Sequence, residues 1–408
     1  MKSHSPQRVV ITGLGIITAI GDNLPDFRRA LFDGRSGIGP VTLFEVSEFP
    51  CTLAGQVGCT DLSAGFSAKT LKRVSRCDLL GLIAAREAVA DAGLTGRTAG
   101  WDRGVVMGGG SGGMLSWEIF RRARAEGRRA PASGLICSPP CTLTDRLAGQ
   151  YGLGGYRATV TTACSSSTTA IGVACDMIRS GALTLALTGG SEALCELTFA
   201  GFNALRVMSP EPCRPFDKDR RGLSLGEGAA VLVLESQEHA IQRGAPVYAE
   251  VLGHAINSDA YHMTAPHPEG LGMRTVMTRA LENAGLAASQ VAYVNAHGTA
   301  TRVNDPLETR AVKTVFGPER RRMPLVSSTK SMVGHCLGAA GGIEAVATVL
   351  AVHHQTAPPT AGLSTPDPEC DLDYVAGKAR PTDIGYAISN SFAFGGNNTC
   401  IVFKRADG

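Results

Sequence analysis

The sequence predicts an α/β protein whose chain forms two similar halves. Short runs of β-branched residues alternate with stretches that carry apolar residues at helical spacing, and this pattern starts again near residue 248. No Pro- or Ser-rich linker separates the two series, which favours one rigid body. Of the 408 residues, 44% are hydrophobic and 18% are charged, so a large core can form. We therefore expect the halves to be residues 1–250 and 251–408.

The first half contains five candidate strands and two candidate helices. Each strand is a short β-branched or apolar run, and each helix has apolar residues three and four positions apart. The strands are expected at residues 8–12, 104–107, 159–162, 184–188 and 229–235, and the helices at residues 26–32 and 79–92.

The second half repeats this order of elements and closes on a pair of strands. The strands are expected at residues 248–252, 291–295, 325–327, 386–389 and 399–403, and the helices at residues 272–284 and 341–352.

The charge balance gives no support to nucleic-acid binding as the main task. The 39 basic and 36 acidic side chains give a net charge of only +3, so a basic patch can only be local. Twelve cysteines are scattered along the chain without a C-x-x-C pair, which favours buried thiols in a reducing compartment over disulfides.

Neither a signal peptide nor a membrane span is expected. Residues 2–21 place basic residues before an apolar run, but Gly13 and Gly15 interrupt the run and no cleavage site follows. We expect a first buried strand there. The longest uncharged stretch, residues 158–175, is rich in Ser and Thr and does not suit a bilayer. The expected location is the cytoplasm.

Two glycine motifs do not match nucleotide-binding loops. Gly13-Leu-Gly15 follows a predicted strand, as the G-x-G-x-x-G motif of dinucleotide-binding folds does. The third glycine of that motif would fall at Thr18, however. The cluster at residues 108–113 lacks the Gly-Lys-Ser/Thr ending of a phosphate loop. It is expected to form a turn beside a pocket.

Cys164 lies where a predicted strand turns into a predicted helix. The residues around it are small, and apolar residues at helical spacing follow. Free amides and the helix dipole at such an elbow stabilise a thiolate. From this pattern alone, Cys164 is either a nucleophile or a buried structural thiol, and Cys175 is expected to be structural.

Two histidines in the second half shift this balance towards a nucleophile. His297 and His335 each lie among Gly, Ser and Thr after a predicted strand. Singly, each would more often cap or hydrogen-bond a loop, but together with Cys164 they supply two imidazoles to a nucleophile. Neither has a second metal ligand at helical or hairpin spacing, so no metal is expected. His353 and His354 are expected on the surface.

These motifs resemble those of the β-ketoacyl-[acyl carrier protein] synthases of the thiolase superfamily. The likeness covers essentially the whole chain and also includes the segments 214–217, 226–228 and 259–264. It is carried by the Cys164 elbow, His297-Gly-Thr-Ala-Thr, Lys330-Ser-Met-Val-Gly-His335 and Asn390-Ser-Phe-Ala-Phe394-Gly-Gly. The resemblance implies a doubled α-β-α-β-α sandwich, usually a dimer.

The resemblance also implies a reaction. Cys164 would accept an acyl chain from the phosphopantetheine arm of an acyl carrier protein. Malonyl carrier would then lose CO2, and the resulting enolate would attack the Cys164 thioester in a Claisen condensation. His297 and His335 would stabilise the enolate, with Lys330 and its acidic partner Glu308 organising the loops. No cofactor and no metal is implied.

Further residues follow from the same resemblance. Backbone amides of Cys164 and Phe394 would hold the oxyanion, and the two phenylalanines of the closing motif would form the gate over Cys164. The remaining assignments are gate residues Phe392 and Phe394, substrate-binding residues Thr299, Thr301, Ser111 and Phe202, and carrier-docking residues Lys69, Lys72, Arg73 and Arg206, beside further arginines at 76, 121, 122, 124, 128 and 129.

Several departures point towards a type II polyketide or polyene ketosynthase. Cys164 is followed by three serines, Ala393 replaces the usual gate glycine, and Asn397 replaces Thr or His. Ser111 lies where elongation synthases often carry a bulky residue that limits the acyl pocket. With Cys164 intact, the chain would be the active subunit, as a homodimer or beside a cysteine-lacking chain-length factor homologue.

Other functions remain as alternatives. The nearest is a housekeeping fatty-acid elongation synthase of the synthase II type. A thiolase would need a second catalytic cysteine where this chain reads Phe-Ala-Phe-Gly-Gly, and a starter-unit or plant-type synthase would use Asn where this chain offers His335. A scaffold or chain-length partner would not need Cys164, His297 and His335.

Overall fold

A computed structural model describes residues 6–58, 61–94, 96, 99–317 and 323–406. Ten strands form one mixed sheet in the order β11-β10-β14-β15-β9-β1-β8-β6-β4-β5. They are β1 Val9–Thr18, β4 Arg103–Gly108, β5 Arg157–Val160, β6 Leu185–Glu192, β8 Gly228–Ser236, β9 Ala249–Ser258, β10 Tyr293–Asn295, β11 Leu325–Ser327, β14 Tyr386–Phe392 and β15 Asn397–Arg405.

The two halves of this sheet have the same topology. Numbered along the chain within each half, both follow the order 3-2-4-5-1, and they join where β1 pairs with β9. In each half the fifth strand pairs antiparallel with the first and the fourth, while the second pairs parallel with the third and the fourth. The predicted doubled α/β fold is confirmed. The boundary at residue 250, which falls within β9, stays a prediction.

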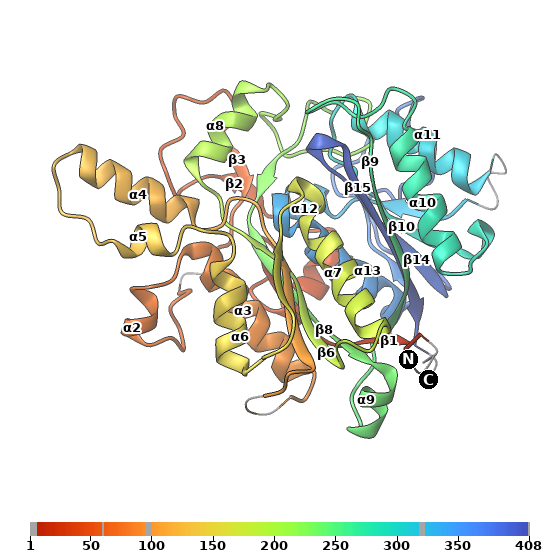
Figure 1. The fold of residues 1–408 in the computed structure, drawn as a ribbon. Coiled ribbons are helices and arrows are strands. Elements are labelled where there is room, and N and C mark those ends of the chain that lie inside the picture. The colour runs from red at the N-terminus through yellow and green to blue at the C-terminus, as the bar shows by residue number, and fades with distance from the viewer. Residues whose placement is uncertain (1–5, 59–60, 95, 97–98, 318–322, 407–408) are drawn as a thin grey trace.

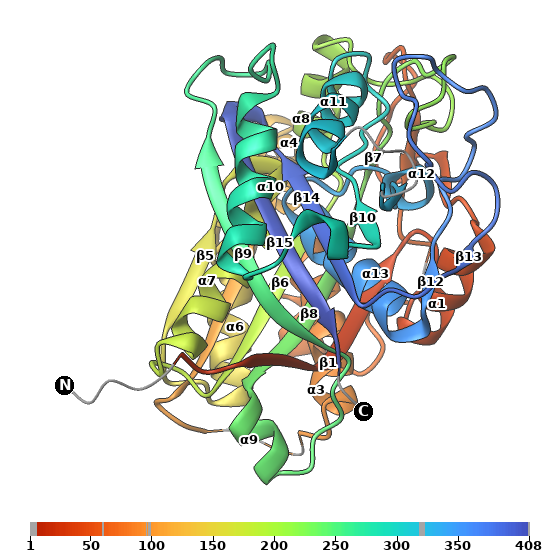
Figure 2. The same ribbon diagram turned by 90° about the vertical axis from the view of Figure 1, so that its right-hand side faces the viewer.

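Helices form three layers around the two halves of the sheet. Figure 1 shows α7 and α13 in the middle, α3 and α6 on one outer side, and α10 and α11 on the other; in Figure 2, α10 lies in front of β9 and β15. The helices are α1 Leu24–Asp33, α2 Ala68–Leu71, α3 Arg76–Asp91, α4 Met114–Ala125, α5 Ser133–Ile136, α6 Thr142–Tyr151, α7 Ser166–Arg179, α8 Glu196–Ala204, α9 Gln237–Gln242, α10 Leu271–Asn283, α11 Asn304–Phe316, α12 Lys330–Val333 and α13 Ala340–His354.

Short elements complete the chain between these helices and strands. A small sheet has the order β2-β3-β7, and β12 pairs with β13. These elements are β2 Ile38–Pro40, β3 Leu53–Gly55, β7 Leu225–Gly226, β12 Thr356–Ala357, β13 Arg380–Pro381 and the 3₁₀ turns η1 Ala163–Ser165, η2 Ala288–Gln290, η4 Leu337–Ala339 and η5 Phe394–Gly396.

The middle layer is the centre of the core. The largest apolar cluster contains residues of α7, α13 and both halves of the sheet, and two further clusters lie beneath α3 and beneath α10 and α11. The segment Leu337–His354 is long and apolar enough to cross a membrane by length and composition, but 83% of it is buried inside the protein. We therefore interpret it as the central core helix of this sandwich.

Gly13 and Gly15 serve helix packing. Both lie within β1, which runs through them to Thr18 as one buried strand. A Cβ at Gly13 would lie 2.3 Å from the carbonyl oxygen of Ala88, and one at Gly15 would lie 1.9 Å from that of Ala84. The glycines therefore let α3 approach the strand. This close packing, rather than nucleotide binding, explains the motif.

Gly15→Ala should destabilise the protein because α3 has to move away from β1 to admit the new Cβ. Overpacking of this kind costs about 1–3 kcal/mol, so Tm should fall. Gly149→Ala is the matched control: Gly149 lies on α6, and a Cβ there meets nothing within 4 Å. Differential scanning calorimetry of both variants measures the effect. An unchanged Tm for Gly15→Ala would contradict this account of helix packing.

Candidate active site

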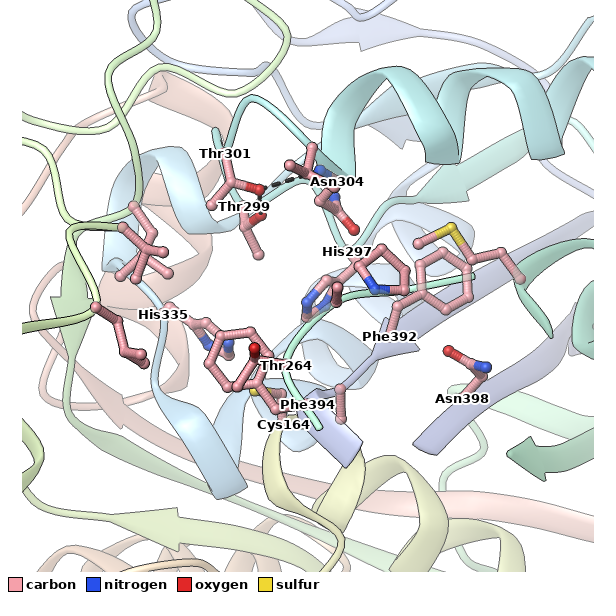
Figure 3. Close-up of a pocket in the computed structure, with 18 of the residues that line it drawn as sticks. Cys164, Thr264, His297, Thr299, Thr301, Asn304, His335, Phe392, Phe394 and Asn398 are labelled. Carbon is pink, nitrogen blue, oxygen red and sulfur yellow. Dashed lines mark hydrogen bonds between the residues drawn. The ribbon is translucent and has the colours of Figure 1, made fainter. Parts of the chain in front are cut away.

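A pocket of about 230 Å³ opens between the two halves, and most of the predicted site residues meet there. Figure 3 shows Cys164 and Phe394 below the imidazoles of His297 and His335, with Thr299 and Thr301 on a separate part of the wall. The predicted residues that line this pocket are Cys164, Phe202, His297, Thr299, Thr301, His335, Phe392 and Phe394.

Cys164 lies in a strained turn at the start of a central helix. It belongs to η1 and immediately precedes α7, and Ala163 has a φ of 51°, which a residue with a side chain rarely adopts. The hydroxyls of Ser165 and Ser166 donate to the carbonyl oxygens of Thr162 and Ala163 at 2.8 and 2.6 Å. These two serines therefore hold the elbow that the sequence predicted.

The next hydroxyls of this run bind the other half of the protein. Ser167 accepts the amide of Gly342 at 2.8 Å, and Thr168 shares a hydrogen bond with Ser391 at 2.7 Å. A Cβ at Gly341 would lie only 1.8 Å from Oγ1 of Thr168. The serines after Cys164 thus have structural partners in the closely packed middle layer.

The Cys164 thiol is buried and protonated in the free protein. Burial raises its pKa to about 11, although the charge of Lys330 and the backbone amides of Phe394 and of Cys164 itself act to lower it. Amides at the elbow do stabilise the thiolate, as the sequence pattern indicated, but desolvation outweighs them and leaves the thiol less acidic than usual. The two amides near the sulfur are nevertheless those expected to form the oxyanion hole.

His297 is oriented from both its backbone and its ring. The carboxylate of Glu308 accepts the amides of His297 and Gly298, each at 2.8 Å. Nδ1 of His297 lies 3.3 Å from Nζ of Lys330. An ammonium group can only donate, so Nδ1 accepts and the ring proton lies on Nε2.

Glu344 is the acidic partner of Lys330, and the expectation that Glu308 has this role is wrong. Lys330 is 2% exposed and its Nζ forms a hydrogen-bonded ion pair with Glu344 on α13. Glu308 instead fixes the loop that carries His297. Sequence reasoning missed Glu344 because it lies within the otherwise apolar helix predicted at residues 341–352.

His335 faces His297 and is held by two neighbouring segments. Its amide donates to the carbonyl oxygen of Ser224 at 2.7 Å, and its Nδ1 accepts the amide of Leu337 at 3.2 Å. This leaves the proton on Nε2. The two imidazole rings are 5.5 Å apart at an angle of 86°.

Both imidazoles are uncharged at neutral pH. Burial lowers the pKa of His297 well below its ordinary value, and the charge of Lys330 and the ring of His335 act in the same direction. Burial, aided by Lys330, also lowers the pKa of His335. The pocket therefore holds one thiol and two neutral N–H donors.

The closing motif covers this pocket with two aromatic rings. Phe394 stacks on Phe202 with ring centroids 5.9 Å apart, and Phe392 lies 6.0 Å from the ring of His297. Ala393 has φ and ψ of −101° and 156°, extended values that suit any side chain. The amide of Gly395 donates to Met263 at 2.8 Å, which ties the motif to the loop that follows β9.

Two other groups of predicted residues lie elsewhere. Ser111 is not among the residues that line the pocket, and its amide and hydroxyl bind the buried carboxylate of Glu192; its assignment to substrate binding stays a prediction. Lys72 lines a second hollow, whereas Arg206 is exposed beside Leu205, which lines the first pocket. Lys69 and Arg73 are exposed on either side of Lys72.

Other cysteines and histidines behave as expected from their positions. Cys175 is fully buried on α7, where burial raises the pKa of its thiol to about 12, and His353 and His354 are exposed. Within the described ranges, no group of three or more His, Cys, Asp or Glu side chains could hold a metal ion.

The lowered pKa values of His297 and His335 predict a pH-dependent stability. The unfolded chain takes up protons at these histidines below about pH 6.5, while the folded protein does not. Stability should thus be full above that pH and decrease as the pH falls, by up to about 1.4 kcal/mol per pH unit for each histidine. Calorimetry between pH 7.5 and 5.5 should show a smaller decrease in the His297→Gln/His335→Gln double variant.

The matched control for this measurement is His353→Gln, which leaves both buried imidazoles in place and should retain the wild-type decrease. An equal decrease in the wild type and the double variant would contradict the assignment of neutral, buried histidines.

Comparisons with known proteins place this chain among condensing enzymes. Family models described as β-ketoacyl synthase, N-terminal and C-terminal domains, match residues 6–240 and 248–364. The chain is 41% identical to a 3-oxoacyl-[acyl-carrier-protein] synthase 2 from Synechocystis sp., over 99% of this chain and 100% of the relative.

Solved structures agree with the family models. The ishigamide ketosynthase/chain length factor is 35% identical with a TM-score of 0.93, covering 98% of this chain and 100% of the other. A type II polyketide synthase acyl-carrier protein in complex with its hexaketide-bound ketosynthase gives 31% identity and a TM-score of 0.88 over the same shares. The chain belongs to the β-ketoacyl synthase family and has the thiolase-like fold that its motifs predicted.

Proposed function

We propose that this protein condenses an acyl chain held on Cys164 with malonyl-acyl carrier protein, giving β-ketoacyl carrier protein and CO2. The observation that carries the proposal is one buried pocket that contains a thiol and two neutral imidazoles. Relatives named 3-oxoacyl-[acyl-carrier-protein] synthase 2 support the same reaction.

In the first step, the sulfur of Cys164 attacks the thioester carbonyl of the incoming acyl carrier. The new C–S bond forms as the bond to the carrier's pantetheine sulfur breaks, and the proton of Cys164 passes to that leaving sulfur. Amides of Cys164 and Phe394 lie close enough to the thiol to affect its pKa. Donors in this position stabilise the negative oxygen of the tetrahedral intermediate.

In the second step, the malonyl thioester binds beside the acylated cysteine. Nε2–H of His297 and of His335 donates to its thioester oxygen while the bond to the carboxylate breaks and CO2 leaves. The electron pair of that bond becomes the enolate, whose charge develops on the oxygen that the two imidazoles contact. Neutral imidazoles suit this step because Nε2 of each ring already carries the hydrogen that it donates, so neither ring has to be protonated first.

In the third step, the enolate carbon attacks the acyl carbon on Cys164. A C–C bond forms, the C–S bond to Cys164 breaks, and the released thiolate takes up one proton from solvent, which is the proton that the overall reaction consumes. Lys330 and Glu344 form a buried ion pair behind His297. We assign to this pair the orientation of the ring and of its tautomer.

We further propose that both substrates arrive on the phosphopantetheine arm of an acyl carrier protein, with no resident cofactor or metal. Thr299 and Thr301 line the pocket and share a hydrogen bond at 3.0 Å, which suits contact with a pantetheine amide. Lys72, Arg128 and Arg129 line a separate basic hollow that suits an acidic carrier. The expected location of this activity is the cytoplasm.

A second subunit is part of this proposal. β5 is an end strand of the ten-stranded sheet, and α4 has Ala123 as its single buried residue. Nearby, Ile119 and Ile136 are 63% and 72% exposed. Such apolar surface suits either a second copy of this chain or a cysteine-lacking homologue, in line with the ishigamide ketosynthase/chain length factor.

For the pathway, we propose type II polyketide or polyene synthesis, with fatty-acid elongation as the second candidate. The high TM-score to the ishigamide protein favours the first and the 41% identity to a synthase 2 favours the second. Ser111 no longer contributes to this choice, since its side chain binds Glu192.

Cys164→Ala should abolish acyl loading while the fold is retained, because the substitution removes one sulfur atom from a large core. The measurement is the intact mass of the protein after incubation with acyl carrier, with circular dichroism to check the fold. Cys175→Ala is the matched control, since it removes a buried thiol from α7, the helix that follows Cys164, and should still be acylated. Acylation retained in Cys164→Ala would refute the assignment.

Carrier-bound products should distinguish the two pathways. The protein, alone or together with a cysteine-lacking homologue, is incubated with malonyl carrier and with saturated, polyunsaturated or β-keto acyl carriers. The carrier-bound products are then identified by intact-mass spectrometry. We expect polyene or poly-keto chains to be elongated once the homologue is present. Efficient elongation of saturated chains by the protein alone would instead assign it to fatty-acid synthesis as a homodimer.

A further inference from the structure

Glu192 is a fully buried carboxylate that joins three segments of the protein. It ends β6, and its side chain is 0% exposed. Oε2 accepts the amides of Gly110 at 2.9 Å and Gly338 at 3.0 Å, and Oε1 accepts the amide of Ser111 at 2.8 Å and also its hydroxyl. Burial raises the pKa of Glu192 and these four donors oppose the rise. All four contacts are satisfied by the ionised form.

Gly338 belongs to a second elbow that resembles the one carrying Cys164. Each elbow is a 3₁₀ turn just before a central helix, η1 before α7 and η4 before α13, and the two turns are in contact. Leu337 has a φ of 46°, as Ala163 has a φ of 51° before Cys164. A left-handed residue with a side chain costs about 1–3 kcal/mol and persists only where its surroundings hold it.

The second elbow determines how His335 presents its proton. The amide of Leu337 donates to Nδ1 of His335 at 3.2 Å, and the next amide, that of Gly338, donates to Glu192. Successive amides of one strained turn therefore bind the imidazole and the carboxylate. Fixing one amide fixes the direction of the other.

We propose that Glu192 is the positioning residue of His335: its carboxylate holds the second elbow so that Leu337 keeps the imidazole proton on Nε2, facing the pocket. This inference rests on the proposed role of His335 in malonyl decarboxylation. In this role Glu192 contacts no substrate and takes no part in acyl transfer to Cys164.

Glu192→Gln is the direct test, because the glutamine NH2 group would face amide donors and weaken the hold on the elbow. The rate of CO2 release from malonyl carrier should fall about 10- to 100-fold, as expected when a reacting group is misplaced. Acylation of Cys164, followed by intact mass, should keep its wild-type rate. Equal loss of both half-reactions would overturn the proposal.

A double-variant cycle separates positioning from general destabilisation. His335→Ala should itself impair decarboxylation more than acyl transfer, and adding Glu192→Gln to it should then cause no further loss of CO2 release. A further loss in the double variant would show that Glu192 acts independently of His335. If the wild type releases no CO2, the proposed function fails; if it is active but the cycle is additive, only this inference fails.

Glu235→Gln is the matched control. Glu235 is also a 0% exposed carboxylate with several donors, on β8 and outside the pocket, so its loss should lower Tm without separating the half-reactions. Should Glu192→Gln fail to fold, Ser111→Ala removes one donor from the same carboxylate. It should lower CO2 release with unchanged acylation, and no such difference would overturn the proposal.

Discussion

The site depends on how closely α7 and α13 approach each other in the middle layer. Glycines on α13 permit this approach: a Cβ at Gly341 would overlap the hydroxyl of Thr168, and the amide of Gly342 reaches Ser167 at 2.8 Å. A larger residue at Gly341 would separate the two helices. The turns that begin them would then also separate, and Cys164 would no longer share a pocket with His335.

Duplication of the fold gives two equivalent elbows, and the protein uses them differently. The first presents Cys164 to the pocket, while the second orients the histidine that precedes it. Burial favours the neutral form of the thiol and of both imidazoles, since it raises the pKa of the thiol and lowers the pKa of each imidazole. The thiol and the two imidazoles around the place where negative charge is expected to develop are thus neutral, and the buried charge of Lys330 behind His297 is paired with Glu344.

Sequence predicted the features that local pattern determines. The ten main strands and the Cys164 elbow follow from β-branched runs and from small residues at a strand-to-helix turn, and the motifs identified the residues that meet in the pocket. The partners of buried groups could not be predicted, because they come from distant segments. Glu344 lies 14 residues from Lys330, and Glu192 lies more than 80 residues from Ser111. For Cys164, the sequence indicated the helix terminus but could not weigh it against desolvation.

The most direct test of the account is the protonation of the two imidazoles, because the proposed chemistry needs an N–H donor on Nε2 of each. ¹⁵N NMR of the histidine-labelled protein at neutral pH, with signals assigned from His297→Asn and His335→Asn variants, measures it. The account predicts that both rings are neutral, with the proton on Nε2 and an unprotonated Nδ1. A charged ring, or a proton on Nδ1 of either histidine, would contradict it.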